Sequence, residues 1–347
     1  MNMTESLRNW LHKGNEGWDR FWFTPEDPAT LSMIRITAGC MLLYTHGVWT
    51  IGFDAFFGPH AWLSYDIAAR LQGDPFGWSH FWLIRSPGIL LAIHWGGWVV
   101  FALLILGLFT RVVSVLAFLL TVSYAHREPA ALFGLDQVNA MLAFYLMLGP
   151  SGGAFSLDRL LKVGRAGGRL PVEHYISANV TIRLIQLHMC IIYMFAGMSK
   201  LQGITWWNGT AMWGAIANLE YQSIDMTWLA HYPVLVAFLT HITIFWELYY
   251  CALVWPRFTR PVVVLLAIPL HLGIAAFLGM ITFGTAMLLG NLAFVSPRLV
   301  RKIFDRSPTP TPSEKPGMSI GQGGNSPKGR GSRKGKRGRK SQARQGS

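Results

Sequence analysis

Long apolar runs alternate with shorter polar and aromatic segments along this 347-residue chain. A helix needs about 17–25 predominantly apolar residues to cross the hydrocarbon core of a bilayer, and several runs approach or reach that length. We therefore predict an all-α, polytopic membrane bundle of about eight transmembrane helices. The predicted spans are residues 29–51, 88–109, 111–125, 137–150, 177–200, 228–252, 261–279 and 281–297. The third, fourth and eighth are short or carry polar residues, so the number eight depends on them.

Two segments between the spans are rich in aromatic residues. Residues 53–87 are predicted to lie partly in the membrane interface, and residues 208–221 to form a second interfacial helix. The chain is accordingly divided into three parts. These are a cytoplasmic or interfacial N-terminal segment (1–28), a transmembrane domain (29–306) and a tail (307–347).

The composition supports a membrane protein. Hydrophobic residues make up 52% of the chain and charged residues only 14%, whereas soluble domains carry about 25% charged residues. Trp and Phe gather near the ends of the apolar runs, as expected for interfacial aromatic belts. An ordinary soluble globular domain is thereby excluded for most of the chain.

The basic residues are unevenly distributed. Ten Lys/Arg and one acid, Glu314, lie in residues 307–347, so the tail contributes +9 of the formal net charge of +13. With eight spans and a cytoplasmic N-terminus, the outside loops hold only four basic residues, and this positive-inside bias predicts an N-in, C-in topology. The inside loops would carry Arg111, Arg159, Lys162, Arg165, Arg169, Arg257, Arg260, Arg298, Arg301 and Lys302, and the outside loops Arg70, Arg85, Arg127 and Lys200.

The tail is of low complexity and has almost nothing to bury, which predicts disorder. Two partners suit its charge. Anionic lipid attracts a basic segment by about 1 kcal/mol per basic residue near the surface, and nucleic acid attracts it through phosphate. The tail has no aromatic residue to stack on a base, so the sequence favours lipid.

Motifs of the common enzyme classes are missing from the sequence. Cys40, Cys190 and Cys251 lie in apolar runs without a CxxC pair, which predicts three buried, reduced thiols and no metal site. No Walker motif, dinucleotide-binding fingerprint, HExxH or GxSxG occurs, so nucleotide, zinc-protease and hydrolase functions have no support.

The most informative sequence closes the fifth predicted span. There, Ala196-Gly-Met-Ser-Lys200-Leu is followed by Trp206, Trp207 and Gly209. Weaker motifs in the same order are Arg20-Phe-Trp-Phe-Thr-Pro25, Gly107-Leu-Phe-Thr-Arg111, Gly134-Leu-Asp136-Gln, Leu157-Asp158, and Pro269-Leu-His271 with Phe283. Their order and spacing over residues 18–297 resemble the HTTM (horizontally transferred transmembrane) family, which includes the membrane domain of vitamin K-dependent γ-glutamyl carboxylase.

The resemblance implies a role for Lys200. In the animal carboxylase, the matching lysine is implicated as the base that deprotonates vitamin K hydroquinone. Oxygen then adds, the resulting alkoxide takes a γ-proton from a glutamate, and carbon dioxide traps the carbanion. Such a lysine must be neutral when it acts, and burial in a low dielectric favours the neutral amine. The implied cofactor is reduced vitamin K or menaquinol.

Helical geometry adds a partly polar stripe beside Lys200. At 100° per residue, Gln186, Met189, Tyr193 and Lys200 fall within about 40° of one another. A stripe of this kind faces protein or a cavity rather than lipid. Together with the resemblance, which implies a quinol, this stripe and the Trp-Trp turn give Gln186, Tyr193, Trp206 and Trp207 as the candidate quinol-binding residues.

Structural explanations compete with these roles. A lysine at a helix end beside two tryptophans is typical of a snorkelling interfacial anchor, and the residues alone favour that interpretation. The resemblance makes the catalytic base equally well supported. His271 is the second candidate catalytic residue, holding a quinol oxygen or relaying a proton. A core histidine bonded to a neighbouring helix is the commoner role for such a residue.

Glu247 lies inside the sixth predicted span, where a carboxylate requires a partner or a proton. The candidate partners are Arg183, Arg35 and His188, although Arg35 is better placed to anchor the cytoplasmic end of the first span. His241, about 120° away around the helix, is not expected to share the partner of Glu247.

Differences from the animal enzyme weaken the carboxylase assignment. No lumenal domain follows residue 306, Ser199 stands where that enzyme has a second lysine, and Ile274 stands where an asparagine follows the later histidine. We therefore expect a bacterial-type member in the inner (plasma) membrane. Its function is either that of a quinol-dependent modifying enzyme or that of a non-catalytic transport or partner-binding protein. A third hypothesis is a tether that acts through the tail.

Overall fold

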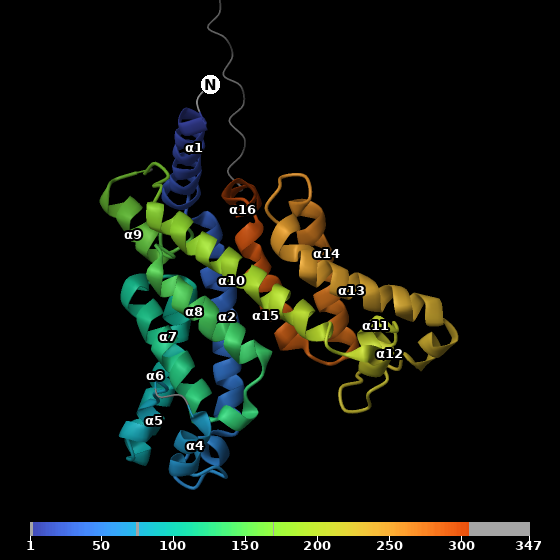
Figure 1. Ribbon diagram of the computed structural model, residues 1–347. Helices are drawn as coiled ribbons and strands as arrows, with labels where there is room; N and C mark the ends of the chain where they lie inside the picture. The colour runs from blue at the N-terminus through green and yellow to red at the C-terminus, as the bar shows by residue number, and fades with distance from the viewer. Residues whose placement is uncertain (1–2, 74–75, 169, 305–347) are drawn as a thin grey trace, which may run out of the picture. The chain divides into compact units, whose positions relative to one another are not determined.

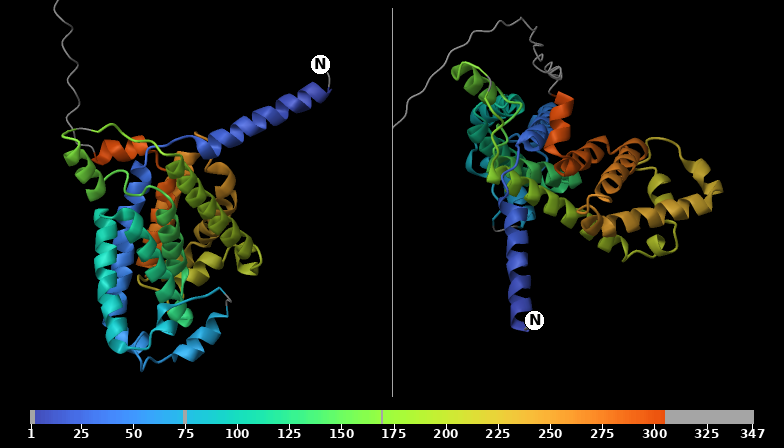
Figure 2. Two further views of the ribbon diagram at one scale, coloured as in Figure 1. Left: turned by 90° about the vertical axis from the view of Figure 1, so that its left-hand side faces the viewer. Right: turned by 90° about the horizontal axis from the view of Figure 1, so that it is seen from above.

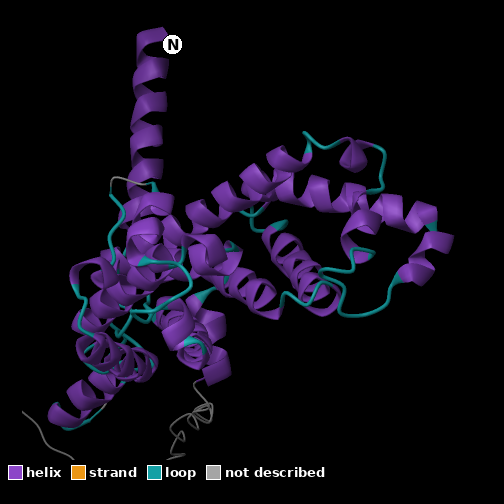
Figure 3. Cartoon of the chain, turned by 90° about the horizontal axis from the view of Figure 1, so that it is seen from below, coloured by secondary structure: helices purple, strands orange, loops and turns teal. Residues whose placement is uncertain are grey.

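A computed structural model describes residues 3–73, 76–168 and 170–304. Within these residues the chain is helical and contains no strand, only an isolated antiparallel bridge between Glu26 and Tyr175 (Figure 3). The predicted all-α class is confirmed. The α-helices are α1 (Met3–Phe23), α2 (Ala29–Ile51), α3 (Phe53–Phe56), α4 (Tyr65–Gln72), α5 (His80–Leu83), α6 (Pro87–Leu106), α7 (Thr110–Arg127), α8 (Gly134–Leu148), α9 (Leu157–Arg165), α10 (Ile176–Lys200), α11 (Ile204–Trp207), α12 (Ala211–Ile216), α13 (Pro233–Leu253), α14 (Arg260–Phe277), α15 (Ile281–Asn291) and α16 (Pro297–Phe304). The 3-10 helices are η1 (Pro129–Ala131), η2 (Thr227–His231) and η3 (Leu292–Phe294).

The long helices form two groups that meet at α15. In the first group, α2 packs against α6 and α8, and α7 packs against α6 and α8. In the second, α10 runs along α13, and α14 forms a hairpin with α15. Because α15 also contacts α2, α8 and α10, it lies between the groups (Figures 1 and 2). The largest apolar core lies at this junction and includes Tyr193 of α10 and Trp246 of α13.

Four of the described helices, α6, α10, α13 and α14, are long and apolar enough to cross a membrane. A fifth span is added if α15 with η3 and α16 are counted together across a bend of 111°. All eight predicted ranges contain a helix. However, α8 has only 15 residues, and α2 and α7 carry the buried cations Arg35 and Arg127 among several hydroxyl side chains.

The N-terminal segment contains a helix that the sequence analysis did not predict. The end of α1 is fixed to α10 by Asn179, whose amide donates to the carbonyl oxygens of Phe21 (2.8 Å) and Trp22 (3.0 Å). The Arg183 guanidinium also lies 4.5 Å from the centroid of the Phe21 ring. The segment therefore joins the helical domain at its end, while Trp18 stays exposed.

The turn between α6 and α7 gives two of the family motifs a structural role. Gly107 ends α6 in the left-handed conformation, at φ 68°. The Asp158 carboxylate then accepts hydrogen bonds from the Phe109 N–H (2.9 Å), the Thr110 N–H (2.8 Å) and the Thr110 hydroxyl (2.7 Å). Asp158 thus satisfies free N–H groups at the start of α7. The Gly107–Arg111 and Leu157–Asp158 motifs are parts of one contact.

The prediction that Arg35 anchors the end of the first span is wrong. Its side chain is completely buried, and its guanidinium donates to the carbonyl oxygens of Leu104 (2.9 Å) and Phe155 (2.6 Å). A buried cation needs acceptors, and these carbonyls lie at the end of α6 and in the loop before α9. Arg35 therefore connects three segments inside the protein.

The three cysteines are free, but the prediction that all are buried is wrong. Cys190 is buried, Cys251 is half-buried, and Cys40 is exposed. The described helices thus leave this position of α2 uncovered.

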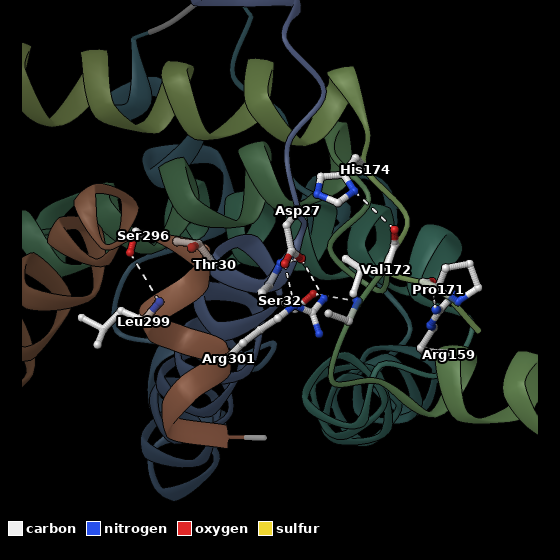
Figure 4. A network of polar contacts seen from close by, with 12 residues as sticks. Asp27, Thr30, Ser32, Arg159, Pro171, Val172, His174, Ser296, Leu299 and Arg301 are labelled. Carbon is white, nitrogen blue, oxygen red and sulfur yellow. Dashed lines mark hydrogen bonds and ion pairs between the residues drawn. The ribbon is translucent and has the colours of Figure 1, made fainter. Parts of the chain in front are cut away.

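An ion pair connects α16 to the start of α2. Arg301 donates through its Nε and Nη2 atoms to the two carboxylate oxygens of Asp27 (Figure 4). The hydroxyl of Thr30 donates to the carbonyl oxygen of Val295 at 3.1 Å. A bidentate arginine–carboxylate pair is geometrically specific, so it fixes the bend that follows α15 against the first long helix of the domain.

Asp158→Asn is expected to destabilise the protein at neutral pH by about 1 kcal/mol and to matter less in acid. Burial alone raises the pKa of Asp158, but hydrogen bonds from Thr110 and Phe109 and the charge of Arg35 outweigh it, so its pKa is lowered. A lowered pKa contributes stability above the unfolded-state value, which is lost as pH falls through the folded value. Thermal unfolding of both proteins at pH 7 and near pH 3 measures this, with exposed Asp19→Asn as control. If the wild type and Asp158→Asn differed in stability by the same amount at both pH values, the capping role of the Asp158 carboxylate would be refuted.

Candidate functional site

The last turn of α10 lies close to α13 because a glycine faces the contact. A Cβ atom added at Gly197 would lie 2.9 Å from the side chain of Leu248 and 3.2 Å from its backbone nitrogen. A larger residue would separate the two helices. The sequence Ala196-Gly-Met-Ser-Lys200 therefore places Lys200 one turn beyond the closest approach of α10 to α13.

At this point Lys200 forms an ion pair with Glu247 of α13. The Lys200 Nζ atom lies 2.9 Å from Oε1 and 2.7 Å from Oε2 of Glu247. The exposed fraction of the side chain is 23% for Lys200 and 8% for Glu247. The ammonium also lies 5.3 Å from the centroid of the Trp206 ring, within cation–π range. Lys200 is thus held between a carboxylate and an indole.

The candidate partners that the sequence suggested for Glu247 are all wrong. Arg183 donates to the side-chain oxygen of Gln186 at 3.0 Å. Arg35 donates to backbone carbonyl oxygens at the end of α6 and before α9. His188 forms a hydrogen bond with the hydroxyl of Tyr145 at 3.0 Å. Sequence reasoning treated Lys200 and Glu247 as separate problems, although each is the partner that the other requires. His241 contacts the carbonyl oxygen of Trp207 instead (3.3 Å), as expected from its different face.

A buried polar network lies in the core beside this ion pair. His271 Nε2 lies 2.7 Å from the Tyr193 hydroxyl, and the Asn291 amide donates to the same hydroxyl at 2.8 Å. The Tyr250 hydroxyl donates to Asn291 Oδ1 at 2.6 Å. The network joins α10, α13, α14 and α15. Tyr250 of this network follows Glu247 by three residues, so the two side chains lie on one face of α13.

The predicted stripe on α10 faces protein. Gln186, Met189 and Tyr193 are buried, and the Gln186 amide donates to the carbonyl oxygen of Ala293 at 2.8 Å. The structure pairs Tyr193 with His271 and places Lys200 beside Trp206. Gln186 makes its contact elsewhere on α10, with η3.

The two tryptophans differ in their surroundings. Trp206 is half-buried beside Lys200, while Trp207 is 63% exposed and its Nε1 donates to the carbonyl oxygen of Leu201 at 2.7 Å. Gly209 follows in the left-handed region, at φ 80°, against Ala237 of α13. The Trp-Trp-x-Gly segment thus folds back onto α13, and only Trp206 contacts the ion pair.

Tyr250 and Asn291 are the residues of this site that sequence reasoning missed. Asn291 is an amide at the end of an apolar helix, and such intramembrane polar groups usually have a partner. Tyr250 follows Glu247 by three residues, which places both on one face of α13. These signals were present, but nothing in the sequence connected α13 to α15.

A second buried polar cluster lies in the other group of helices. His94 contacts the Tyr124 hydroxyl through Nδ1 (2.7 Å) and the Thr50 hydroxyl through Nε2 (2.9 Å). His46 Nε2 lies 2.9 Å from the carbonyl oxygen of His94. The aromatic rings of residues 53–87 pack around Tyr124, including Phe57. This predicted interfacial segment therefore contributes to the core through α3, α4 and α5.

Two pockets lie away from Lys200. One, of about 270 Å³, lies between α6 and α7 and is lined by apolar residues with Trp78 and His80. The other, of about 180 Å³, lies between the α3 region and the start of α6, beside Asp54. Among the described residues, no three His, Cys, Asp or Glu side chains are grouped as metal ligands.

The comparisons with known proteins decide the family. The HTTM domain model matches residues 23–298, which is most of the chain. The chain belongs to the HTTM domain family. HTTM is a membrane domain, and the apolar helices of the structure agree with a membrane protein. No curated protein and no solved structure matches the chain.

Proposed function

We propose that this HTTM protein is a quinol-dependent membrane enzyme of the vitamin K carboxylase type, in which Lys200 and Glu247 together accept a proton. The observation that carries the proposal is the contact of the two groups, at 2.7–2.9 Å, beside the Tyr193–His271 network. A costly intramembrane cation is thereby placed next to polar groups that can orient a ligand. The residues that we assign to this site, besides Glu247, are Lys200, His271, Tyr193 and Trp206.

The residues suit a quinol. A hydroquinone is a flat ring with two hydroxyl groups, so it needs an apolar aromatic surface, a proton acceptor and a hydrogen-bond donor. Trp206 and Trp246 supply indole rings, and the ion pair supplies the acceptor. The Nδ1 atom of His271 is buried and has no hydrogen-bond partner within the part of the chain that the structure describes. A bound quinol would place its ring against the indole rings and one ring oxygen near His271. We propose reduced vitamin K or menaquinol as this cofactor.

The pair, rather than the lysine alone, is suited to act as the base. Two strongly coupled groups share their protons, so one proton on the pair leaves it without net charge. When the shared proton is on the Glu247 carboxyl, the Lys200 amine is neutral and its nitrogen can accept a second proton. A bound quinol would supply that proton from a ring hydroxyl: the O–H bond would break as the N–H bond forms, and the electron pair would stay on the oxygen. The resulting Lys200 ammonium would stabilise the charge on that oxygen electrostatically.

The proposal extends to the membrane and the tail. The basic loops support eight spans with both termini on the cytoplasmic side of a bacterial inner membrane. On this topology the basic tail, which lies outside the described residues, binds anionic lipid rather than nucleic acid. Of the eight helices, α2, α7 and α8 would cross by burying their polar groups against one another.

A non-catalytic function is the alternative, and the same contact supports it. An ion pair whose members satisfy each other can serve only to lock α10 to α13, as in a transport or partner-binding protein. That role requires charge at position 200 but no titratable amine. The two functions therefore differ in what they predict for an arginine at this position.

The deciding experiment measures saturable binding of menaquinone and vitamin K hydroquinone, and hydroquinone-dependent oxygen uptake, in purified protein. Lys200→Arg keeps a cation for Glu247 but cannot accept a proton, so we expect it to bind quinol with at least 100-fold slower uptake. Lys200→Ala is expected to lose uptake as well.

Lys162→Ala, at an exposed lysine on α9, is the matched control and should behave as the wild type. Absence of saturable binding in the wild type would overturn the quinol function. Full oxygen uptake in Lys200→Arg would assign Lys200 to the structural role instead.

A further inference from the structure

The direction of every hydrogen bond in the Tyr250–Asn291–Tyr193–His271 network is fixed by one backbone carbonyl. The Asn291 side-chain nitrogen lies 2.9 Å from the carbonyl oxygen of Met287. A carbonyl oxygen only accepts hydrogen bonds, so the atom facing it must be the amide NH₂. The amide orientation is therefore determined, and Asn291 Oδ1 faces Tyr250.

The directions at the two tyrosines follow from this orientation, because His271 Nε2 is the acceptor that the described residues offer to the Tyr193 proton. Asn291 Oδ1 is an acceptor, so the Tyr250 hydroxyl donates to it at 2.6 Å. The second amide hydrogen of Asn291 is donated to the Tyr193 hydroxyl at 2.8 Å. Since Tyr193 accepts from Asn291, its own proton is available for His271 Nε2, 2.7 Å away.

This chain selects one tautomer of His271. Nε2 accepts the Tyr193 proton, so in the neutral imidazole the hydrogen is on Nδ1. A protonated imidazole would present N–H at both nitrogens and leave the Tyr193 proton without an acceptor among the described residues. The Nδ1–H group is buried and has no partner among the described residues, and leaving a buried donor without a hydrogen bond is unfavourable.

The rings around His271 leave its free N–H in an apolar aromatic setting. The centroids of Trp246 and Phe283 lie 6.4 and 6.5 Å from the imidazole centroid. The Trp246 indole N–H would not compete with His271 for a ligand oxygen, because its Nε1 already donates to the carbonyl oxygen of Val263 at 3.1 Å. A ligand oxygen is the missing acceptor that this arrangement suits.

We propose that His271 is a hydrogen-bond donor through Nδ1–H to a ring oxygen of the quinone, and that the Tyr250–Asn291–Tyr193 chain sets it in that state. The proposal rests on the proposed quinol function and deepens it. His271 then cannot serve as the base, because its only acceptor nitrogen is occupied by Tyr193. It binds the oxidised quinone as well, since a quinone carbonyl is an acceptor. Tyr193, Asn291 and Tyr250 are positioning residues.

The first test needs no ligand. Nitrogen NMR of the full-length protein labelled with ¹⁵N-histidine, with the His271 signals assigned by their loss in His271→Phe, reports which ring nitrogen carries hydrogen. We expect hydrogen on Nδ1 in the wild type, and a mixture of tautomers in Tyr193→Phe. A wild type with hydrogen on Nε2 would overturn this inference while leaving the quinol function intact.

The second test uses oxidised menaquinone. The infrared carbonyl stretch of the bound quinone should be shifted by the hydrogen bond in the wild type and in Lys200→Arg, and the shift should be absent in His271→Phe. Affinity for menaquinone is expected to fall about tenfold in His271→Phe. An unshifted carbonyl in the wild type overturns the donor role alone, whereas no binding at all overturns both this inference and the proposed function.

Discussion

Lys200→Met is expected to lower the free energy of unfolding by about 3 kcal/mol. Removing one member of a buried ion pair costs about 3–5 kcal/mol because the other charge is left uncompensated. Glu247 is the deeper member, with 8% of its side chain exposed, and it would lose the partner it contacts at 2.7–2.9 Å. The partial exposure of Lys200, 23%, places the expected cost at the lower end of that range.

A double-mutant cycle separates this structural effect from catalysis. Replacing both members, as in Lys200→Met with Glu247→Leu, is expected to restore stability to within about 1 kcal/mol of wild type, since apolar residues often replace a buried pair without loss. Reversible unfolding in detergent measures the four proteins. If the single variant is as stable as the wild type, the pair does not exist in the folded protein.

The cycle also bears on the proposed function. The double variant should fold and still lack hydroquinone-dependent oxygen uptake, because the proton acceptor is gone. A stable double variant that retains uptake would show that the pair is a lock between α10 and α13 and nothing more. Stability and activity thus give independent answers about the same two residues.

Gly107→Ala is the second change with a large expected effect, a loss of about 2–4 kcal/mol. At φ 68°, a residue with a Cβ costs about 1–2 kcal/mol more than glycine. The added atom would also collide with the guanidinium of Arg35 and lie 2.5 Å from Ser156 Cβ, and overpacking adds about 1–3 kcal/mol. Displacing Arg35 would break its hydrogen bond to Leu104.

Gly96→Ala is the matched control for this prediction. Gly96 lies in α6, and a Cβ atom there would meet nothing within 4 Å. Because alanine favours a helix over glycine, we expect Gly96→Ala to be neutral or stabilising by up to about 1 kcal/mol. Equal melting temperatures for the Gly107→Ala and Gly96→Ala proteins would contradict the role assigned to Gly107.

Apolar run length was enough to locate the long helices. The predicted range 29–51 coincides with α2, and 177–200 differs from α10 by one residue. The reason is physical: in a membrane the backbone must satisfy its own hydrogen bonds, so a long apolar run has almost no alternative to a helix. The amphipathic helix α1 was missed because its mixed composition carries no such constraint.

The family motifs also marked true structural contacts, although the sequence did not say which. The order of the motifs led to the HTTM family, and the family match covers residues 23–298. Only the fold showed that Asp158 caps α7 at the Gly107 turn. A capping carboxylate supplied from a different helix leaves no local spacing signal.

The sequence by itself determined that this protein is helical, that it belongs in a membrane, and that Lys200 ends its fifth long apolar run. The tertiary structure alone decided that Glu247 is the partner of Lys200, that Arg35 is interior, and that Asn291 donates a hydrogen bond to Tyr193. Helices can be predicted from the sequence because the apolar pattern that marks them is set by residues close together in the chain. Pairing of charges depends on which helices touch, and that is settled by packing across the whole domain.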